Sequence, residues 1–379
     1  MSRRHPIHRH PIRRLLLPAL LSALFAAVTG VTGAAAAPLA PAAQAAAAAA
    51  WAPSGNVHDC GSSVHLLVPT RSSGYFAENP GKLLAAPASV AAGPGVATVL
   101  DKVASAHVHF LTALSCGQGH PGAPVTGTGG RASADSGSAG NAKGTNWSGY
   151  QSMSTGTRYL GGAMTWTVPA PQAPADSVVT SSIWTGIGSG ESTSDTLVQA
   201  GTEQDNTCQF GCFLYGNVYY FFFELYPQQQ QVVVDNLGLE PGDSVASVVQ
   251  YDPSTQTAYF QLDNLTQKDG LNFTETLTGT DPGSGSHAEW ILERTEFNST
   301  WTAVGDFGTL NVTGAQAYAG SSLATARTYA ADDPAVDPLA IDLYDCAGQQ
   351  LEHTSPFTSS TAFTMTWLAY GSSDPAYSC

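Results

Sequence analysis

From residue 146 to the C-terminus, the chain alternates hydrophobic and polar positions with a period of two. Phe363, Met365 and Trp367 alternate with threonines, and turn sequences such as Pro-Gly-Asp and Asp-Pro-Gly separate such runs. Alternation places successive side chains on opposite faces of a strand. No long helical period occurs between the strands, so the pattern predicts an all-β sandwich or barrel. Further runs of this kind cover 231–234, 245–251 and 258–262.

The first 36 residues have the composition of a signal peptide. Five arginines precede an apolar stretch at 15–31, and three alanines at 34–36 offer a cleavage site. A membrane anchor is the alternative, but Pro18 and Gly30 interrupt the stretch, which is shorter than the roughly 20 residues that a span needs. We therefore expect 1–36 to be removed on export and the protein to be secreted, with no membrane attachment.

Residues 37–145 differ in composition from the rest of the chain. Within them, 51–118 has the pattern of a small ordered unit, whereas 117–145 is rich in Gly, Ser and Ala, as in links that proteases reach. A small unit followed by such a link is typical of a zymogen. We expect 37–145 to be a propeptide that is cut near 129–144 on acidification, so that the mature chain starts close to Thr145 or Asn146. The alternative is an accessory domain that stays attached. The strand pattern lies at 63–68 and the helical spacing at 96–114.

Charge separates the two parts of the chain. From 146 to 379 there are four basic and 25 acidic residues, a net charge of −21 near neutral pH. Such a surface repels phosphates, so nucleic acid and anionic membranes are excluded as partners. Its self-repulsion relaxes as carboxylates are protonated, which suits an acidic environment. Solubility alone is an equally good reason for the charge. We expect a monomer.

Six cysteines in an exported chain indicate disulfides. Proximity favours Cys208–Cys212 and Cys346–Cys379 among the three pairings that these four allow, which leaves Cys60 to pair with Cys116. Zinc is the alternative for the first pair, but a second pair with metal-ligand spacing is lacking. We therefore expect no metal.

Two strand-like segments each present one long polar side chain. In 197–201, Gln199 is flanked by apolar residues, and in 288–293 the residues Trp290 and Leu292 suit the sandwich interior. Glu289 and Glu293 then face outward, into a groove. A carboxylate can take a proton from water, and an amide can donate a hydrogen bond to the oxyanion that forms when water attacks a carbonyl. The pair predicts hydrolysis without a nucleophilic Ser or Cys.

The motifs around this pair occur in a characteristic order. In that order and spacing, the region 146–345 resembles the glutamic peptidases, or eqolisins, of the scytalidoglutamic and aspergilloglutamic type. The motifs are Asn-Trp-Ser-Gly-Tyr at 146–150, Met-Thr-Trp-Thr-Val-Pro at 164–169, Trp-Thr-Gly-Ile-Gly at 184–188, Leu-Val-Gln-Ala-Gly at 197–201, Phe-Glu-Leu-Tyr-Pro at 223–227, Glu-Pro-Gly-Asp-Ser at 240–244 and the run from Ala288 to Glu293.

The resemblance implies the fold and the mechanism of the domain 146–379. It implies a two-sheet antiparallel sandwich, similar to concanavalin A, with a concave active-site face. It also implies a secreted acid endopeptidase that acts on polypeptides without a cofactor. Glu293 would be the general base that activates a water molecule, and Gln199 would stabilise the oxyanion.

The resemblance also implies which residues line the substrate cleft. At some of the family's motif positions, however, this chain has a different residue. The family commonly has Asp where this chain has Gly188, and acidic and Trp positions where it has Tyr220 and Phe222. These changes affect the expected substrate preference and leave the Gln/Glu pair intact. The expected substrate-binding residues are Trp147, Trp184, Glu224 and Tyr226.

Carbohydrate chemistry is the main alternative, since lectin-like sandwiches often bind or cut glycans. A glycosidase needs two carboxyl groups roughly 5–9.5 Å apart. Glu289 and Glu293 would lie about 13 Å apart along one strand, but Glu224 and Glu293 fit. A carbohydrate-binding domain without catalytic activity is a further alternative. A Ser-His-Asp triad would need His287 or His353, the two histidines after residue 146.

Overall fold

A computed structural model provides the coordinates of the chain. Contacts divide the chain into two units, 1–38 and 39–379, and every described residue belongs to the second. The structure describes residues 51–53, 57–58, 60, 64–69, 99–111, 113–117, 141–153, 158–188, 196–209, 214–278, 287–297 and 300–375.

Seven antiparallel strands form the first sheet, which carries the candidate residues. Their bounds are β7 (Trp147–Ser152), β10 (Ser182–Gly188), β11 (Leu197–Gln209), β12 (Leu214–Tyr226), β13 (Gln229–Val234), β17 (His287–Glu293) and β23 (Pro338–Tyr344). Neighbouring strands pair in the order β23, β7, β17, β10, β11, β12 and β13.

Five antiparallel strands form the second sheet. They are β8 (Tyr159–Thr167), β14 (Ser244–Asp252), β15 (Thr257–Asn264), β16 (Asp269–Thr276) and β21 (Thr309–Ala319). They pair in the order β21, β8, β14, β15 and β16. The short strand β22 (Arg327–Ala330) pairs with one end of β21.

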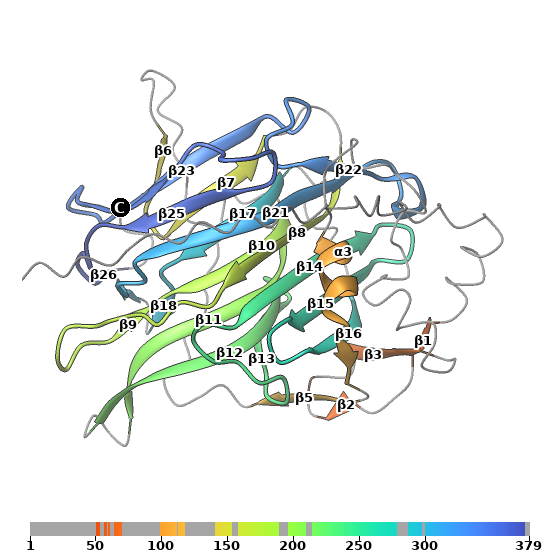
Figure 1. Cartoon of the computed structure of the whole chain (residues 1–379), viewed down its shortest axis with the longest axis horizontal. Coiled ribbons are helices and arrows are strands. Elements are labelled where there is room, and N and C mark those ends of the chain that lie inside the picture. The colour runs from red at the N-terminus through yellow and green to blue at the C-terminus, as the bar shows by residue number, and fades with distance from the viewer. Residues whose placement is uncertain are drawn as a thin grey trace, which may run out of the picture. The chain divides into compact units, whose positions relative to one another are not determined.

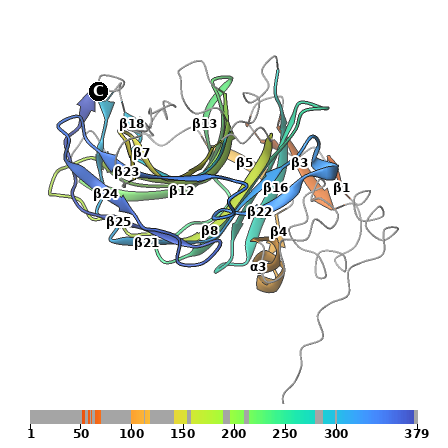
Figure 2. The same ribbon diagram turned by 90° about the horizontal axis from the view of Figure 1, so that it is seen from above.

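Two strands carry the hydrogen bonding around one edge, from the first sheet to the second. These are β24 (Gln350–Thr354), which pairs with β23, and β25 (Phe363–Trp367), which pairs with β24 and with β21. Figure 1 shows the strands of both sheets, and Figure 2 shows the layer of β7, β12 and β13 beside the layer of β8 and β21.

A hydrophobic core fills the space between the layers. It includes Trp290 and Phe223 from the first sheet and Trp166, Phe260 and Phe273 from the second, none more than 2% exposed. The inward residues of each strand are the apolar ones of the period-two pattern, because alternate residues share a face. The predicted two-sheet antiparallel sandwich is confirmed.

Smaller elements complete the domain. The parallel partner of β23 is β6 (Ala142–Gly144), and β9 (Val179–Thr180) pairs with β11 and β20 (Ala303–Val304). A separate small sheet contains β18 (Glu296–Phe297), β19 (Thr300–Trp301) and β26 (Asp374–Pro375). A 3-10 helix, η2 (Leu323–Thr325), follows β21.

The segment upstream of the family motifs has its own elements. They are β1 (Trp51–Pro53), β2 (Val57–His58), β3 (Val64–Pro69), α3 (Val99–Ala106), β4 (His109–Phe110) and β5 (Leu114–Gly117). The strand expected at 63–68 and the helix expected within 96–114 are therefore confirmed. Among the described residues, no helix is long and apolar enough to cross a membrane.

The described cysteines bear on the predicted disulfides. Cys60 and Cys116 form the predicted bond, with their Cα atoms 5.0 Å apart. Cys346 is also disulfide-bonded. The side chains of Cys208, Cys212 and Cys379 lie outside the described residues, so their pairings stay predictions. The predicted signal peptide at 1–36 and most of the predicted link at 117–145 lie outside them too, so both stay predictions.

Candidate active site

The candidate residues lie on the face of the first sheet that points away from the core. On β11 the residues Val198 and Ala200 pack in the core, so Gln199 projects from the opposite face. On β17, Trp290 and Leu292 pack in the same core, as predicted. We call the opposite face the outer face.

One row across the outer face contains two Gln–Glu pairs. Gly186 of β10 lies directly between Glu289 of β17 and Gln199 of β11. Gln199 donates from Nε2 to Oε2 of Glu224 at 2.6 Å, which orients its amide. On the other side, Gln151 donates from Nε2 to Oε1 of Glu289 at 2.9 Å. A Cβ at Gly186 would lie only 3.1 Å from Cβ of Gln199, so the glycine lets that side chain stand where it does.

Two donors hold the Glu293 carboxyl group. Trp184 donates from Nε1 to Oε2 at 2.9 Å, and Asn146 donates from Nδ2 to Oε1 at 3.1 Å. Burial raises the pKa of Glu293 well above its ordinary value, because an ionised carboxylate loses its hydration there. The hydrogen bond from Trp184 lowers this pKa, the charges of Glu224 and Glu203 raise it, and the bond from Asn146 lowers it.

Trp184 occupies space that a glycine on the next strand leaves open. A Cβ at Gly201 would lie 2.7 Å from both Cα and Cβ of Trp184 and would also meet the backbone oxygen of Ile183. Gly201 therefore lets β10 lie close to β11 at Trp184. This close approach positions the residue whose indole Nε1 donates to Glu293.

A second pair of carboxyl groups shares the outer face, and the sequence reasoning missed it. Glu203 lies in the same row as Glu293, with Ser182 of β10 between them. Burial raises the pKa of Asp205 to about 7. Burial also raises the pKa of Glu203, and the nearby charge of Asp205 raises it further. The signal for these residues was present, since 199, 201, 203 and 205 continue one period-two face.

Asn146 was also missed as a contact of the carboxyl group. It was visible in the sequence only as the first residue of the Asn-Trp-Ser-Gly-Tyr motif. Its backbone oxygen accepts from the amide of Arg294, the residue that follows Glu293, at 2.7 Å. The fully buried Arg294 donates to Thr145 O at 2.8 Å and to Asp374 Oδ2 at 2.7 Å. These bonds tie the 145–146 turn to the end of β17.

The structure brings the six predicted site residues onto the outer face of the first sheet. Trp147 pairs in register with Glu293, and Tyr226 pairs with Leu197 at the far end of β11. Gln199 and Glu293 have no hydrogen bond to each other among their described contacts. The predicted residues are Trp147, Trp184, Gln199, Glu224, Tyr226 and Glu293.

The exposure expected for these residues is wrong in one respect. Glu289 and Glu293 were expected to face outward into a groove, but the side chains are 1% and 4% exposed, and Gln199 and Glu224 are as deeply buried. The physical reason is a second apolar cluster on the outer face, which the period-two pattern does not distinguish from a polar surface. Its buried members are Ala142, Trp147, Trp184, Leu197, Tyr220, Phe222, Val233, Ile291 and Ile341.

The departure at Gly188 also has a physical account. A Cβ at this position would lie 2.6 Å from the Thr196 backbone oxygen and 3.1 Å from Cα of Leu197. The aspartate that the family commonly has would therefore clash with β11 in this chain. The glycine matches the local strand spacing, and any binding role of that aspartate is absent here.

Neither histidine considered for a Ser-His-Asp triad contacts a serine hydroxyl in the contacts that follow. His287 contacts the Ser152 backbone oxygen through Nδ1 at 2.6 Å, and His353 lies 3.1 Å from Oδ1 of Asp342. Within the described ranges, no group of three or more His, Cys, Asp or Glu side chains could hold a metal ion.

The fold and the site define an antiparallel β-sandwich with paired amide and carboxyl groups on one sheet face. Residues 145–360 match the family model described as the Peptidase A4 family. The chain therefore belongs to the Peptidase A4 family, the glutamic peptidases or eqolisins, and is a glutamic-type peptidase, a hydrolase.

The solved structures that resemble this chain include two glutamic peptidases. Scytalido-glutamic peptidase with a transition state analog inhibitor is 16% identical, with a TM-score of 0.46 over 59% of this chain and 98% of that one. Aspergilloglutamic peptidase from Aspergillus niger is 23% identical, with a TM-score of 0.40 over 50% of this chain and 99% of that one. A comparison with curated protein sequences gave no match.

Proposed function

We propose that this protein is a secreted, acid-active endopeptidase in which Glu293 activates water and Gln199 stabilises the oxyanion. The observation that carries the proposal is the arrangement on the outer face. Glu293 is held by two neutral donors, Trp184 and Asn146, and the amide of Gln199 is oriented by Glu224. These roles also match the positions at which the family motifs place a Glu and a Gln.

The proposed reaction needs only these groups, a water molecule and a peptide. The ionised Glu293 takes a proton from water while the water oxygen bonds to the carbonyl carbon. The carbonyl oxygen becomes an oxyanion, to which Gln199 donates the Nε2 proton that is not engaged with Glu224. Glu293 then returns the proton to the amide nitrogen as the C–N bond breaks, which releases an amine and a carboxylic acid.

The pKa of Glu293 sets the acidic limb of the pH profile. A general base must be ionised, so the rate rises with pH through the pKa of Glu293, which burial raises. The neutral limb follows from the second carboxyl pair. Ionisation of Asp205, whose pKa is about 7, adds a buried charge to the outer face. We therefore expect activity in acid that falls as Asp205 ionises near neutrality.

Digestion of a denatured protein between pH 2 and pH 7 tests the proposal. Glu293→Gln should abolish turnover, and Gln199→Ala should lower kcat by about 10²–10³, as loss of an oxyanion donor does. Glu289→Gln is the matched control, because it changes a buried carboxyl group of the same strand and should leave most activity. Folding of each variant is checked by circular dichroism.

Two results would overturn these assignments. A folded Glu293→Gln protein with full activity would remove Glu293 as the base. Cleavage of a soluble polysaccharide, with no proteolysis anywhere in the pH range, would instead support the glycoside hydrolase alternative. Chelators and serine-protease reagents should have little effect on the reaction as proposed, since none of its steps uses a metal or a serine.

A further inference from the structure

The segment upstream of the family motifs adds strands to both sheets of the sandwich. On the first sheet, β5 pairs with β13, where Val233 and Val234 lie opposite Gly117 and Cys116. On the second sheet, β3 pairs with β16 in antiparallel register and β4 pairs with it in parallel. Figure 1 shows β5 beside β13 and β3 beside β16, and β4 is labelled in Figure 2. Without them, β13 and β16 would be open edges, which proteins generally cover.

The same segment contributes side chains to the core between the sheets. Leu66 of β3 and Leu114 of β5 are both 0% exposed and belong to the main core cluster, together with Cys60 and Cys116. Leu66 lies in register with the core residue Phe273. Cys60 precedes β3 and Cys116 lies in β5, so the disulfide links the part of the segment that pairs with the second sheet to the part that pairs with the first.

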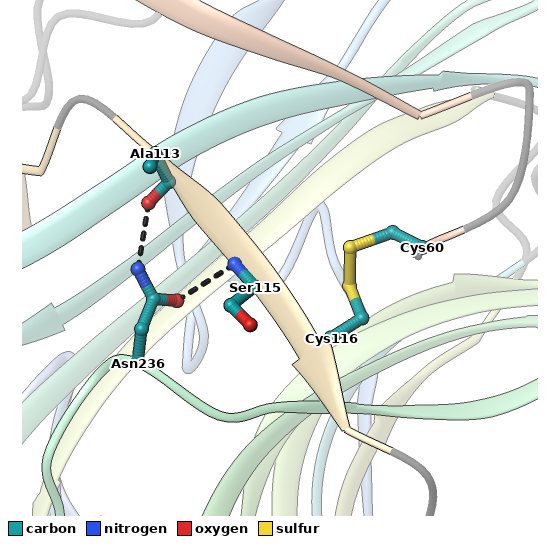
Figure 3. Close-up of a disulfide and its surroundings, with 5 residues drawn as sticks. All are labelled: Cys60, Ala113, Ser115, Cys116 and Asn236. Atoms are coloured by element: carbon teal, nitrogen blue, oxygen red, sulfur yellow. Dashed lines mark hydrogen bonds between the residues drawn. A yellow bond between two sulfur atoms is a disulfide. The ribbon is translucent and has the colours of Figure 1, made fainter. Parts of the chain in front are cut away.

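Polar contacts fix the segment in register with the domain. The Asn236 side chain accepts from the Ser115 amide at 2.9 Å and donates to the Ala113 backbone oxygen at 2.7 Å (Figure 3). On the far side of the second sheet, the Lys102 ammonium group of α3 donates to the hydroxyls of Thr165 at 2.8 Å and Thr313 at 2.6 Å.

A small apolar cluster lies around this helix. Val99 and Val103 of α3 are both fully buried, and they pack with Ala246 and Val248 of β14. The helix thus covers apolar surface on the outside of the second sheet, and the strands of the same segment cover both sheet edges. Three separate surfaces of the domain are therefore occupied by one short stretch of chain.

We propose that residues 51–117 are a permanent part of the mature peptidase, which stays bound without a covalent link after the connection at 118–140 is cut. The reason is that this segment supplies strands at two sheet edges and side chains in the core, as a structural element of the sandwich does. This inference selects the second of the two alternatives that the sequence leaves open.

The position of the cut follows from the start of the described catalytic region. Asn141 donates to Asp342 Oδ1 and to the Thr354 backbone oxygen, both at 2.7 Å, and β6 then pairs with β23. Cleavage within 141–144 would remove this strand from the sheet. We therefore place the cut upstream of Asn141 and expect two N-termini in the mature protein, one before Trp51 and one between 118 and 141.

The test separates cutting from folding. A recognition sequence for a site-specific protease is inserted after Gly129 in the full chain, and the folded protein is cut and passed through a gel-filtration column at pH 4 and pH 7. We expect the two fragments to elute together at both pH values and to separate only in denaturant. The uncut protein is the reference for elution volume and for circular dichroism.

A matched variant shows that the elution reports this interface. Leu66→Asp places a carboxyl group in the shared core, so the fragment should be released after the cut while the uncut variant serves as its control. Release of the wild-type fragment without denaturant would overturn the proposal, whether or not the remaining domain keeps its fold. The readout is physical association, so the result is independent of the roles proposed for Gln199 and Glu293.

Discussion

Asp263 offers a quantitative test of how buried carboxyl groups adapt this fold to acid. It lies on β15, on the face of the second sheet that points away from the core, and is 0% exposed. Gln261 donates to its Oδ2 at 2.7 Å, and Oδ1 has no hydrogen-bond partner among the described residues. Burial raises the pKa of Asp263 from 3.8 to about 8, and the bond from Gln261 opposes this shift only in part.

The size of the effect follows from proton linkage. The folded state holds a proton that the unfolded state releases near pH 4, so the free energy of unfolding falls as pH rises from the ordinary pKa to the raised one. At about 1.36 kcal/mol per pKa unit, this single group removes about 4 kcal/mol of stability between pH 4 and pH 7. Whole domains have roughly 5–15 kcal/mol, so the loss is large.

Asp263→Asn keeps the shape of the side chain and removes its titration. Urea unfolding of both proteins is followed by fluorescence from pH 4 to pH 7, in a Glu293→Gln background that prevents self-digestion. The variant should lose less stability than the parent over this range, by about 4 kcal/mol. The exposed Asp235→Asn is the control and should unfold in parallel with the parent. A constant difference between Asp263→Asn and the parent at every pH would refute the reasoning.

Three further substitutions test the surroundings of Glu293. Trp184→Phe removes a hydrogen bond that lowers the pKa of Glu293, so the acidic limb of kcat against pH should move to higher pH. Glu203→Gln replaces a carboxyl group that burial keeps protonated in acid, so the acidic limb should stay in place. A shift of this limb to lower pH in either variant would contradict these assignments. Arg294→Met leaves Asp374 without its buried partner and should cost about 3–5 kcal/mol in urea unfolding, whereas a change below about 1 kcal/mol would contradict the anchoring role.

The strand faces were predictable from the sequence because period two is a property of single strands. Val198 and Ala200 identified the inward face of β11, and Trp290 and Leu292 did the same for β17. The order of strands in the sheet was not predictable. β10 lies between β11 and β17, which are far apart in the chain, and only tertiary packing determines that Gly186 faces both Gln199 and Glu289.

The contacts of the site were less predictable than its members. The resemblance pointed to Gln199 and Glu293. The proximity of Asn146 and Glu203 to Glu293, by contrast, depends on the register between neighbouring strands, which the sequence does not show. The same limit explains the error on exposure. The pattern of one strand shows which residues point outward, but it does not show whether side chains of neighbouring strands bury them. Trp184 points outward from β10 and belongs to an apolar cluster on the outer face.

The acid adaptation that we propose for this chain has two physical sources, which act in the same direction. The repulsion within the formal charge of −21 over 146–379 relaxes as carboxylates are protonated, which the composition already indicates. Burial adds a second source, because it raises the pKa of Asp205, Asp263, Glu293 and Glu352, on different parts of the two sheets. Each of these groups is best accommodated when protonated, so the fold loses stability as pH rises toward neutrality. Glu293, the proposed catalytic base, shares this preference, so the proposed catalysis requires one buried carboxyl group to ionise while its buried neighbours stay protonated. Neutral donors such as Trp184 and Asn146 meet this requirement, because they stabilise the ionised Glu293 without adding a cation that would also ionise the others.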